Sequence, residues 1–144
     1  MDQVRYAAIK TMVETLYGWT ARGKWDEAEA MLTDDFRIVE AGCLPFGGIY
    51  EGKGALRELY TKVFGFWDDP ALDFTDLAIS EQHAISVMTF HATSRHNGER
   101  LVMPLCEVFH LRGGQFCGIT PYYYDTVAIC RATGMLAKIG RAHV

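Results

Sequence analysis

The sequence predicts a single α+β domain in which helices come first and an antiparallel sheet follows. Three observations predict it: helical periodicity in residues 3–21, four strand-like runs between residues 72 and 124, and glycine-containing turns between those runs. Helices that precede a continuous meander of strands pack together on one face of its sheet. We expect this domain to cover residues 1–144.

The N-terminal half is expected to be mainly helical. Apolar residues at three- and four-residue steps from Val4 to Trp19 predict a helix over residues 3–21. A second helix is predicted over residues 24–32, and a third over residues 54–67, where Pro70 bars continuation. Residues 36–40 are typical of a strand, and residues 41–54 of a glycine-rich loop at the mouth of a pocket.

The C-terminal half is expected to form the sheet. Strands are predicted over residues 72–81, 84–96, 100–112 and 115–124. Asn97-Gly98 and Gly113-Gly114 suit hairpin turns, because asparagine and glycine adopt positive φ at low cost. Asp125 is the expected N-cap of a last helix that begins at Thr126, and Gly134 is expected to end it.

Residues 101–111 are apolar on both sides of the predicted strand. A strand with one face in water would alternate with polar residues. We therefore expect the second face to be covered, most simply by another subunit in a sheet-to-sheet homodimer, or else by a tail or closing strand. One face carries Leu101, Met103, Leu105, Phe109 and Leu111 with Glu107 among them, and the other carries Val102, Cys106 and Val108.

Composition excludes several classes of protein. Of the residues, 49% are hydrophobic and 22% charged, which excludes a disordered chain. The net charge is −4 and basic residues do not cluster, so a nucleic-acid partner is not expected. No apolar run is long enough to span a membrane, so no membrane partner is expected. The N-terminus does not resemble a signal peptide, which predicts a cytoplasmic location.

The four cysteines do not indicate a metal or disulfide framework. They are Cys43, Cys106, Cys117 and Cys130, and none are in CxxC spacing. We expect reduced, mostly buried thiols. A zinc site would need closer His and Cys spacing, so neither a metal nor another cofactor is expected.

Four stretches of sequence carry a resemblance to a known superfamily. They are GKWD at 23–26, LTDDF at 32–36, YEGKGAL at 50–56 and PYYYDT at 121–126. With this order of elements, the chain resembles the nuclear-transport-factor-2-like superfamily, in particular its SnoaL-like and ketosteroid-isomerase-like members. The resemblance covers almost the whole chain. It implies a cone-shaped, cystatin-like curved antiparallel sheet around a deep pocket, with the N-terminal helices packed on the concave face and a C-terminal helix.

The ketosteroid isomerases among these relatives suggest a catalytic acid. In them, an acidic residue near the end of the first strand is the general base, and that position corresponds to Glu40. Their oxyanion-binding tyrosine corresponds to Leu16, with Tyr17 beside it, and their oxyanion-binding acid corresponds to a position near Pro104. These two positions therefore depart from the isomerase pattern.

Other members of the superfamily match less well. Epoxide hydrolases hold a water with an Asp-Arg-Asp set, and Pro121 stands where one of those acids is expected. SnoaL cyclases carry an acid late on the same strand, whereas here the nearest is Asp125. Scytalone dehydratase uses two histidines with tyrosines, and His91 and His110 lie on adjacent predicted strands without a matching motif.

Glu40 is the leading candidate for chemistry. It shares a strand face with Phe36 and Ile38, so its carboxyl is expected to point into the apolar interior. Burial there would raise its pKa and suit it to proton abstraction near neutral pH. The alternative is a glutamate at a frayed strand end that faces solvent or pairs with Arg37 or Lys53.

Glu107 and His91 are the supporting candidates. Glu107 stands among large apolar residues, so it is either a pocket acid that relays protons with Glu40 or half of a salt bridge to Arg95, Arg100 or the first helix. His91 lies in mid-strand and titrates near neutrality, which suits acid–base work or a structural hydrogen bond.

Aromatic and methionine side chains are expected to line the pocket or to form plain core. A tyrosine hydroxyl could donate to a developing enolate oxygen, and Tyr17 is the nearest to the relatives' position. Together such residues suit a small, hydrophobic ligand. The expected lining is Trp19, Tyr60, Phe64, Trp67, Met88, Met103, Phe109 and Phe116, with Tyr122–Tyr124.

The resemblance and the residues together predict a small enzyme that needs no cofactor. It would perform isomerase- or cyclase-type proton transfer on a hydrophobic carbonyl or polyketide-like substrate. Glu40 would be the base, supported by Tyr17, His91 or Glu107. Two alternatives are a non-catalytic module that binds small molecules or mediates association, and an epoxide hydrolase with a rearranged acid set.

Overall fold

The computed structural model describes residues 2–136 and has the predicted α+β architecture. A six-stranded sheet with the order β2-β1-β6-β5-β4-β3 curves around the interior. Its strands are β1 (Leu32–Glu40), β2 (Gly48–Glu51), β3 (Trp67–Ile79), β4 (His83–Ser94), β5 (Arg100–Arg112) and β6 (Gln115–Tyr123). The helices are α1 (Gln3–Ala21), α2 (Trp25–Glu29), α3 (Ala55–Phe64) and α4 (Thr126–Ala132).

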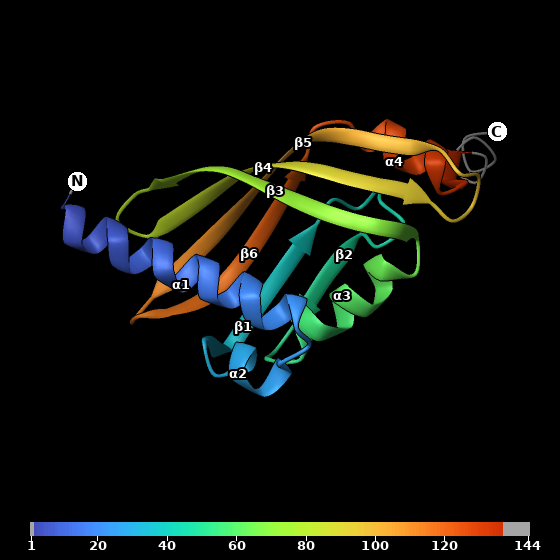
Figure 1. Ribbon diagram of the computed structural model, residues 1–144. Coiled ribbons are helices and arrows are strands. Elements are labelled where there is room, and N and C mark those ends of the chain that lie inside the picture. The colour runs from blue at the N-terminus through green and yellow to red at the C-terminus, as the bar shows by residue number, and fades with distance from the viewer. Residues whose placement is uncertain (1, 137–144) are drawn as a thin grey trace.

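The helices lie against one side and one end of the curved sheet. Figure 1 shows α1 running along the sheet, α3 beside the C-terminal end of α1, and α4 near the end of β4 and the start of β5. The strands from β3 to β6 form a continuous antiparallel meander, as predicted. However, β1 pairs with β6 in parallel, so the sheet as a whole is mixed rather than purely antiparallel.

The second predicted helix is shorter than expected. It ends at Glu29, and Leu32 already belongs to β1. The amide of Phe116 donates to the carbonyl of Met31, and Leu32 pairs with Phe116. Pairing with β6 thus draws these residues into the sheet, where the apolar side chain of Leu32 is buried.

The glycine-rich segment 41–54 contains a strand that the sequence did not predict. Residues Gly48–Glu51 form β2, which pairs antiparallel with β1, from Arg37 opposite Glu51 to Glu40 opposite Gly48. Glycines favour loops locally, but the free edge of β1 supplies backbone partners that outweigh this preference. This pairing holds the C-terminal end of β1, where Glu40 lies.

The third helix ends earlier than predicted, and the strand after it begins earlier. Helix α3 stops at Phe64, and Trp67 opens β3. Pro70 lies within β3 rather than at a helix end, in a register shift between Asp68 and Ala71. Proline is tolerated there because β3 is an edge strand and the shift leaves no ladder hydrogen bond for it to donate.

The remaining element predictions are confirmed. Helix α1 has the predicted bounds, and α4 begins at Thr126. The carboxylate of Asp125 caps α4 by accepting a hydrogen bond from the amide of Ala128 at 2.9 Å. All four cysteines are free, as expected, but only Cys130 is buried, and Cys43 is exposed. Among the described residues, no helix is long and apolar enough to cross a membrane.

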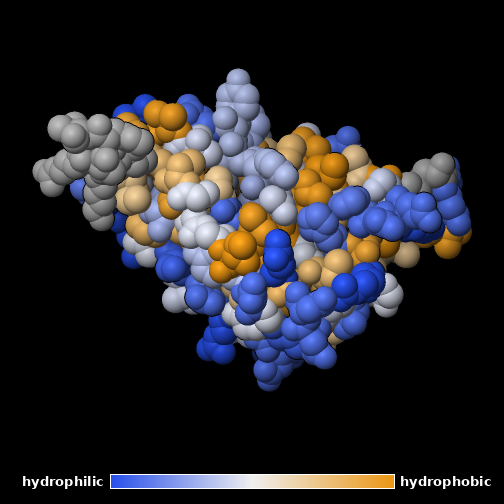
Figure 2. Space-filling view, turned by 180° about the vertical axis from the view of Figure 1, so that it is seen from behind, coloured by the Kyte–Doolittle hydropathy of each residue, from blue (hydrophilic) through white to orange (hydrophobic). Residues whose placement is uncertain are grey.

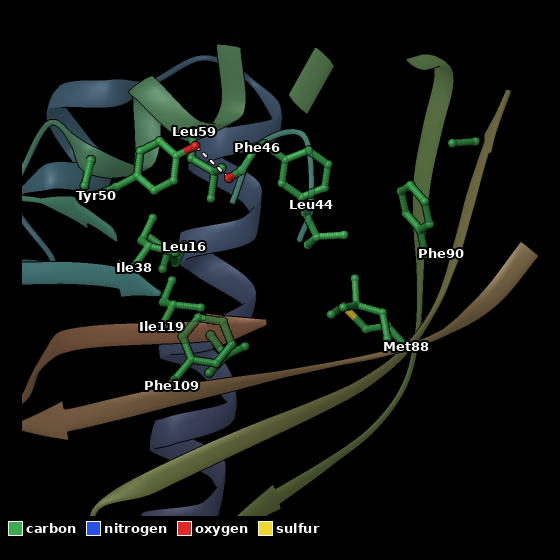
Figure 3. Close-up of a cluster of buried hydrophobic side chains, with 14 of the residues drawn as sticks. Leu16, Ile38, Leu44, Phe46, Tyr50, Leu59, Met88, Phe90, Phe109 and Ile119 are labelled. Carbon is green, nitrogen blue, oxygen red and sulfur yellow. Dashed lines mark hydrogen bonds between the residues drawn. The ribbon is translucent and has the colours of Figure 1, made fainter. Parts of the chain in front are cut away.

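The core lies between the concave face of the sheet and helices α1 and α3. Figure 3 shows Met88 and Phe90 of β4 standing opposite Phe109 and Ile119 across the interior. In the same view the Tyr50 hydroxyl donates to the carbonyl of Phe46 at 2.7 Å, which ties β2 to the chain before it. The interior is thus walled by apolar side chains, and the polar groups it contains stand out.

Candidate active site

A cavity of about 820 Å³ opens between α1, α3 and the concave face of the sheet. Its walls come from both helices and from strands β1 and β3–β6. Most of the lining is apolar, which suits a hydrophobic ligand of drug-like size. Six of the buried apolar lining residues are Leu16, Leu59, Met88, Phe90, Leu105 and Ile119.

Glu40 projects from the end of β1 into this cavity. Burial alternates along the strand, so Phe36, Ile38 and Glu40 face inward together, as predicted. The side chain of Glu40 is 3% exposed, and its Oε1 has no hydrogen-bond partner among residues 2–136. Desolvation by burial, with a smaller contribution from the charge of Glu107, raises the pKa of Glu40 to about 9. Glu40 is therefore a neutral carboxylic acid at neutral pH.

Glu107 is the second carboxyl of the cavity, and it is held by a hydrogen bond. The Tyr17 hydroxyl lies 2.5 Å from Glu107 Oε1 and donates to it. The Ser86 hydroxyl lies 3.0 Å from the same Tyr17 oxygen. Burial raises the pKa of Glu107, and the hydrogen bond from Tyr17 opposes that rise. Of the two alternatives for Glu107, the salt bridge is not found among residues 2–136, where its first-helix partner is Tyr17.

Strand register explains why these polar groups meet. Ser86 on β4 pairs directly with Glu107 on β5, so their side chains leave the same face of the sheet. Tyr17 follows the buried Leu16 in α1, and its ring packs edge-on against Phe109 with centroids 5.7 Å apart. The helix thereby carries the phenol to the point where the two strands present Ser86 and Glu107.

Tyr123 of β6 completes the polar interior. It lines the same cavity, and its pKa is raised well above the usual value by burial and then by the charges of Glu40 and Glu107. The phenol is therefore a hydrogen-bond donor throughout the ordinary pH range. The ring of Tyr123 packs edge-on against Phe90 of β4, with centroids 5.6 Å apart.

The two carboxyls differ in what stabilises their charged forms. Glu107 accepts a hydrogen bond from Tyr17, which favours its carboxylate. Glu40 Oε1 has no such donor. Two interacting carboxyls lose their protons in two separate steps, so the pair retains one proton over a wide pH range. Glu107 loses its proton first, because its charge is one of the causes that raise the pKa of Glu40, so the retained proton resides on Glu40.

The candidate His91 lies outside the cavity, and so does His110. Side chains alternate along β4, and His91 occupies the face opposite Ser86, Met88 and Phe90, with its Nε2 2.7 Å from an Asp73 carboxylate oxygen. His110 likewise packs on the outer face. There its ring meets His83, and its Nε2 lies 3.4 Å from the Thr120 hydroxyl.

The expected lining divides into two groups. Tyr60, Phe64, Met88, Phe109 and Tyr123 line the cavity. The others belong to the solid core or to the surface, because apolar character alone does not distinguish a wall that faces a void from one that faces other side chains. Trp67, Met103 and Phe116 are buried in the core, and Trp19 lies beneath the guanidinium of Arg22 at 4.5 Å.

Sequence reasoning missed Ser86. The sequence did contain a signal for it, because Ser86 is a small polar residue within an apolar alternation and lies opposite Glu107 once the β4–β5 hairpin is paired. The isomerase tyrosine and second acid correspond to Leu16 and a position near Pro104, but the sequence analysis named Tyr17 and Glu107 as candidates, and both of these line the cavity.

The cavity does not assemble the other constellations considered. Among the described residues that line it there is no arginine, so the Asp-Arg-Asp set of an epoxide hydrolase is not brought together. Within residues 2–136, no three His, Cys, Asp or Glu side chains lie close enough to hold a metal ion. What the cavity does bring into one space includes the carboxyls of Glu40 and Glu107 and the phenols of Tyr17 and Tyr123.

Comparison with known proteins agrees with this architecture. The sequence profile of the SnoaL-like domain matches residues 13–119, which include both carboxyls and Tyr17. The chain belongs to the SnoaL-like domain family. No curated protein sequence matches it significantly.

Solved structures share the SnoaL-like fold at low sequence identity. An NTF2-like protein of unknown function from Burkholderia pseudomallei is 17% identical, with a TM-score of 0.77 over 88% of this chain and 97% of that one. TerC, co-crystallised with polyporic acid, is 16% identical, with a TM-score of 0.75 over 88% and 98%. A candidate polyketide cyclase from Xanthomonas campestris is 20% identical, with a TM-score of 0.69 over 88% and 97%. These similarities show the fold.

Proposed function

We propose that this SnoaL-like protein is an enzyme that moves protons on a hydrophobic carbonyl substrate, as isomerases and cyclases do. The observation that carries the proposal is the carboxyl of Glu40, which is buried, borders the cavity and has no hydrogen-bond partner for its Oε1 within the described part of the chain. A second carboxyl, Glu107, borders the same space in a different hydrogen-bonding environment. Two acids whose environments differ are the arrangement that acid–base catalysis uses.

Glu40 acts first as an acid. The sequence alone suggested a base, but a carboxyl with a pKa of about 9 holds its proton at neutral pH. In the proposed reaction it donates that proton to the substrate carbonyl oxygen as negative charge develops there. Tyr123 can add a second hydrogen bond to the same oxygen.

Glu107 acts as the base. Its carboxylate takes the proton from the carbon next to the carbonyl while Tyr17 holds the other carboxylate oxygen. The enol forms when the proton of Glu40 reaches the carbonyl oxygen and the carbon-bound proton reaches Glu107. The pair contains one proton before and after this step, so no net charge enters or leaves the cavity.

A deuterium-exchange experiment tests the proposal without knowledge of the natural substrate. 2-Tetralone and related hydrophobic ketones would be incubated in D2O with the protein, and loss of the proton signals next to the carbonyl would be followed by NMR. We expect exchange above the buffer rate, lowered about 10²-fold or more by Glu40→Gln and by Glu107→Gln. Exchange that both variants leave unchanged would contradict the proposal.

The pH profile separates the acid from the base role of Glu40. An acid is active while it holds its proton, so the exchange rate should fall as pH rises through about 9. A base with the same pKa would give the opposite profile, with an exchange rate that rises toward pH 9.

Tyr17→Phe is expected to raise the pKa of Glu107, because it removes a hydrogen bond that favours the carboxylate. The low-pH fall in exchange rate that comes from protonation of Glu107 should therefore move to higher pH.

The comparisons support a small organic ligand for this cavity. TerC, which shares the fold, was crystallised with polyporic acid, and a second relative is a candidate polyketide cyclase. A polyketide-like carbonyl compound is therefore the substrate class that we favour. The apolar walls described above would hold its carbon frame and leave its carbonyl among the carboxyls and phenols.

We also propose that the chain forms a homodimer through the outer face of its sheet. Val102 on β5 is 58% exposed, and Tyr122, opposite Cys106 on the same face, is 60% exposed. Seen from behind the view of Figure 1, the surface carries several hydrophobic patches among hydrophilic residues (Figure 2). A second copy packed on β5 and β6 would remove such side chains from water.

A further inference from the structure

The ionisable groups of the cavity are mostly acids. Glu40 and Glu107 border its interior, and Glu14 and Asp76 also line it. Among the described lining residues, Lys10 is the one cation. Its ammonium lies 3.3 Å from Glu14, and both of these side chains are about half exposed. The buried acids therefore have no positive partner in the interior.

A buried carboxylate without a cation is unusual, because removing it from water is costly unless a partner replaces the lost hydration. Glu107 receives one hydrogen bond, from Tyr17. Glu40 Oε1 receives none, although it is buried and borders the cavity. The protein avoids a second buried charge by keeping Glu40 protonated. A positive charge supplied by a ligand would remove the reason for that protonation.

Aromatic rings surround the same space. Tyr17 makes edge-on contacts with Phe74 and with Phe109, each at a centroid distance of 5.7 Å, and all three line the cavity together with Tyr123. A cation is attracted to the face of an aromatic ring, and the attraction grows when water is excluded. Carboxyls inside a ring of aromatic side chains are the surroundings that a hydrophobic ammonium ion prefers.

We propose that the cavity binds a hydrophobic amine as its ammonium ion, with the positive nitrogen between Glu40 and Glu107 and the carbon frame against the apolar walls. The inference goes beyond the proposed reaction, because binding requires no turnover. It also explains why the lining brings together acidic side chains without a buried cation, because the ammonium group of the ligand would be their positive partner.

Binding in this form must release a proton. The ammonium ion arrives charged from water, and Glu40 is neutral before binding. Pairing with the ammonium ion ionises Glu40, whose proton passes to the buffer, so that one ammonium enters and one proton leaves. The other ionisable residues that share the lining are Tyr6, Lys10, Glu14, Tyr17, Tyr60, Asp76, Glu107 and Tyr123. Burial raises the pKa values of Tyr17, Tyr60 and Tyr123, so these phenols keep their protons, and Glu107 loses its proton before Glu40 does.

Isothermal titration calorimetry with two matched ligands tests the proposal. 1-(2-Naphthyl)ethylamine and 2-acetylnaphthalene share a carbon frame and differ in carrying an ammonium group or a neutral carbonyl. At neutral pH we expect the amine to bind at least about tenfold more tightly. Titrations in buffers of different ionisation enthalpy should show about one proton released per amine bound and none for the ketone. Equal or tighter binding of the ketone would overturn the proposal.

Two variants locate the effect. Glu40→Gln should lower the affinity for the amine about tenfold or more and abolish proton release. Glu14→Gln removes one negative charge from a half-exposed lining position and is expected to change neither quantity by more than about twofold. Proton release that persists in Glu40→Gln would overturn the proposal, because another group would be its source.

The outcome is independent of the proposed reaction. Loss of amine binding with retained, Glu40-dependent deuterium exchange would reject the ammonium site and leave the enzyme proposal intact. Amine binding with proton release but without exchange on any ketone would support the ammonium site and count against the reaction.

Discussion

At the residue scale, the fold buries Glu40 in surroundings that disfavour its charged, carboxylate form. No residue from 2 to 136 donates a hydrogen bond to Glu40 Oε1, and burial raises the pKa of Glu40 from 4.5 to about 9. Between these two values the folded protein binds a proton that the unfolded chain has lost. The free energy of unfolding therefore falls as pH rises through this interval, by up to about 1.4 kcal/mol per pH unit. Stability from this group is complete only below about pH 4.5.

Glu40→Gln should remove this pH dependence, because glutamine does not ionise. We expect the unfolding free energy of the variant, minus that of the wild type, to increase with pH between about 5 and 9. Urea denaturation at several pH values measures this difference. The exposed glutamate Glu51 provides the control, and Glu51→Gln should give a difference that stays constant. A constant difference for Glu40→Gln as well would show that its carboxyl is hydrated.

The sequence predicted Glu40 well and the rest of the polar cluster only in part. Strand alternation places Glu40 with Phe36 and Ile38, and this signal is local. Contacts of Tyr17 with Ser86 and Glu107 depend on how a helix packs across two strands, which no local pattern reveals. His91 was a candidate by residue type, but its strand position puts it on the outer face.

At the element scale, the connection between β1 and β2 supports the end of the strand that carries Glu40. Its turn brings Gly47 against the preceding chain, so that a Cβ at this position would lie 2.3 Å from the carbonyl oxygen of Ala41. Only glycine permits this approach. The sequence showed glycines without showing which of them the fold requires, and for that reason β2 was read as loop.

Gly47→Ala should therefore destabilise the protein by about 2 kcal/mol or more, because backbone must move to relieve the contact. Gly42→Ala is the matched control, since an added Cβ there meets nothing within 4 Å. Thermal unfolding monitored by circular dichroism compares the two. Equal melting temperatures would contradict the structure of this connection.

At the scale of the whole molecule, the fold was predictable and its oligomeric state remains a prediction. Helices followed by a meander specified the architecture, whereas the parallel pairing of β1 with β6 joins segments far apart in sequence and left no local trace. The apolar outer face of β5 predicted a covered surface. In the single chain that face exposes Val102 and Tyr122.

Analytical ultracentrifugation tests the proposed dimer. We expect the wild type to sediment as a dimer and Val102→Glu to sediment as a monomer, because the variant places a charge within the proposed interface. Val4→Glu is the control, since Val4 is exposed at the start of α1, away from that face. A monomeric wild type, or a Val102→Glu variant that remains dimeric, would reject an interface centred on β5.

Both proposals for the cavity rest on a neutral carboxyl at Glu40. Infrared difference spectroscopy of the wild type against Glu40→Gln, recorded across a pH titration, measures its protonation directly. We predict the signal of a protonated carboxyl at neutral pH, lost as pH rises through about 9. A carboxylate signal at neutral pH, with titration near the ordinary value of 4.5, would contradict the account.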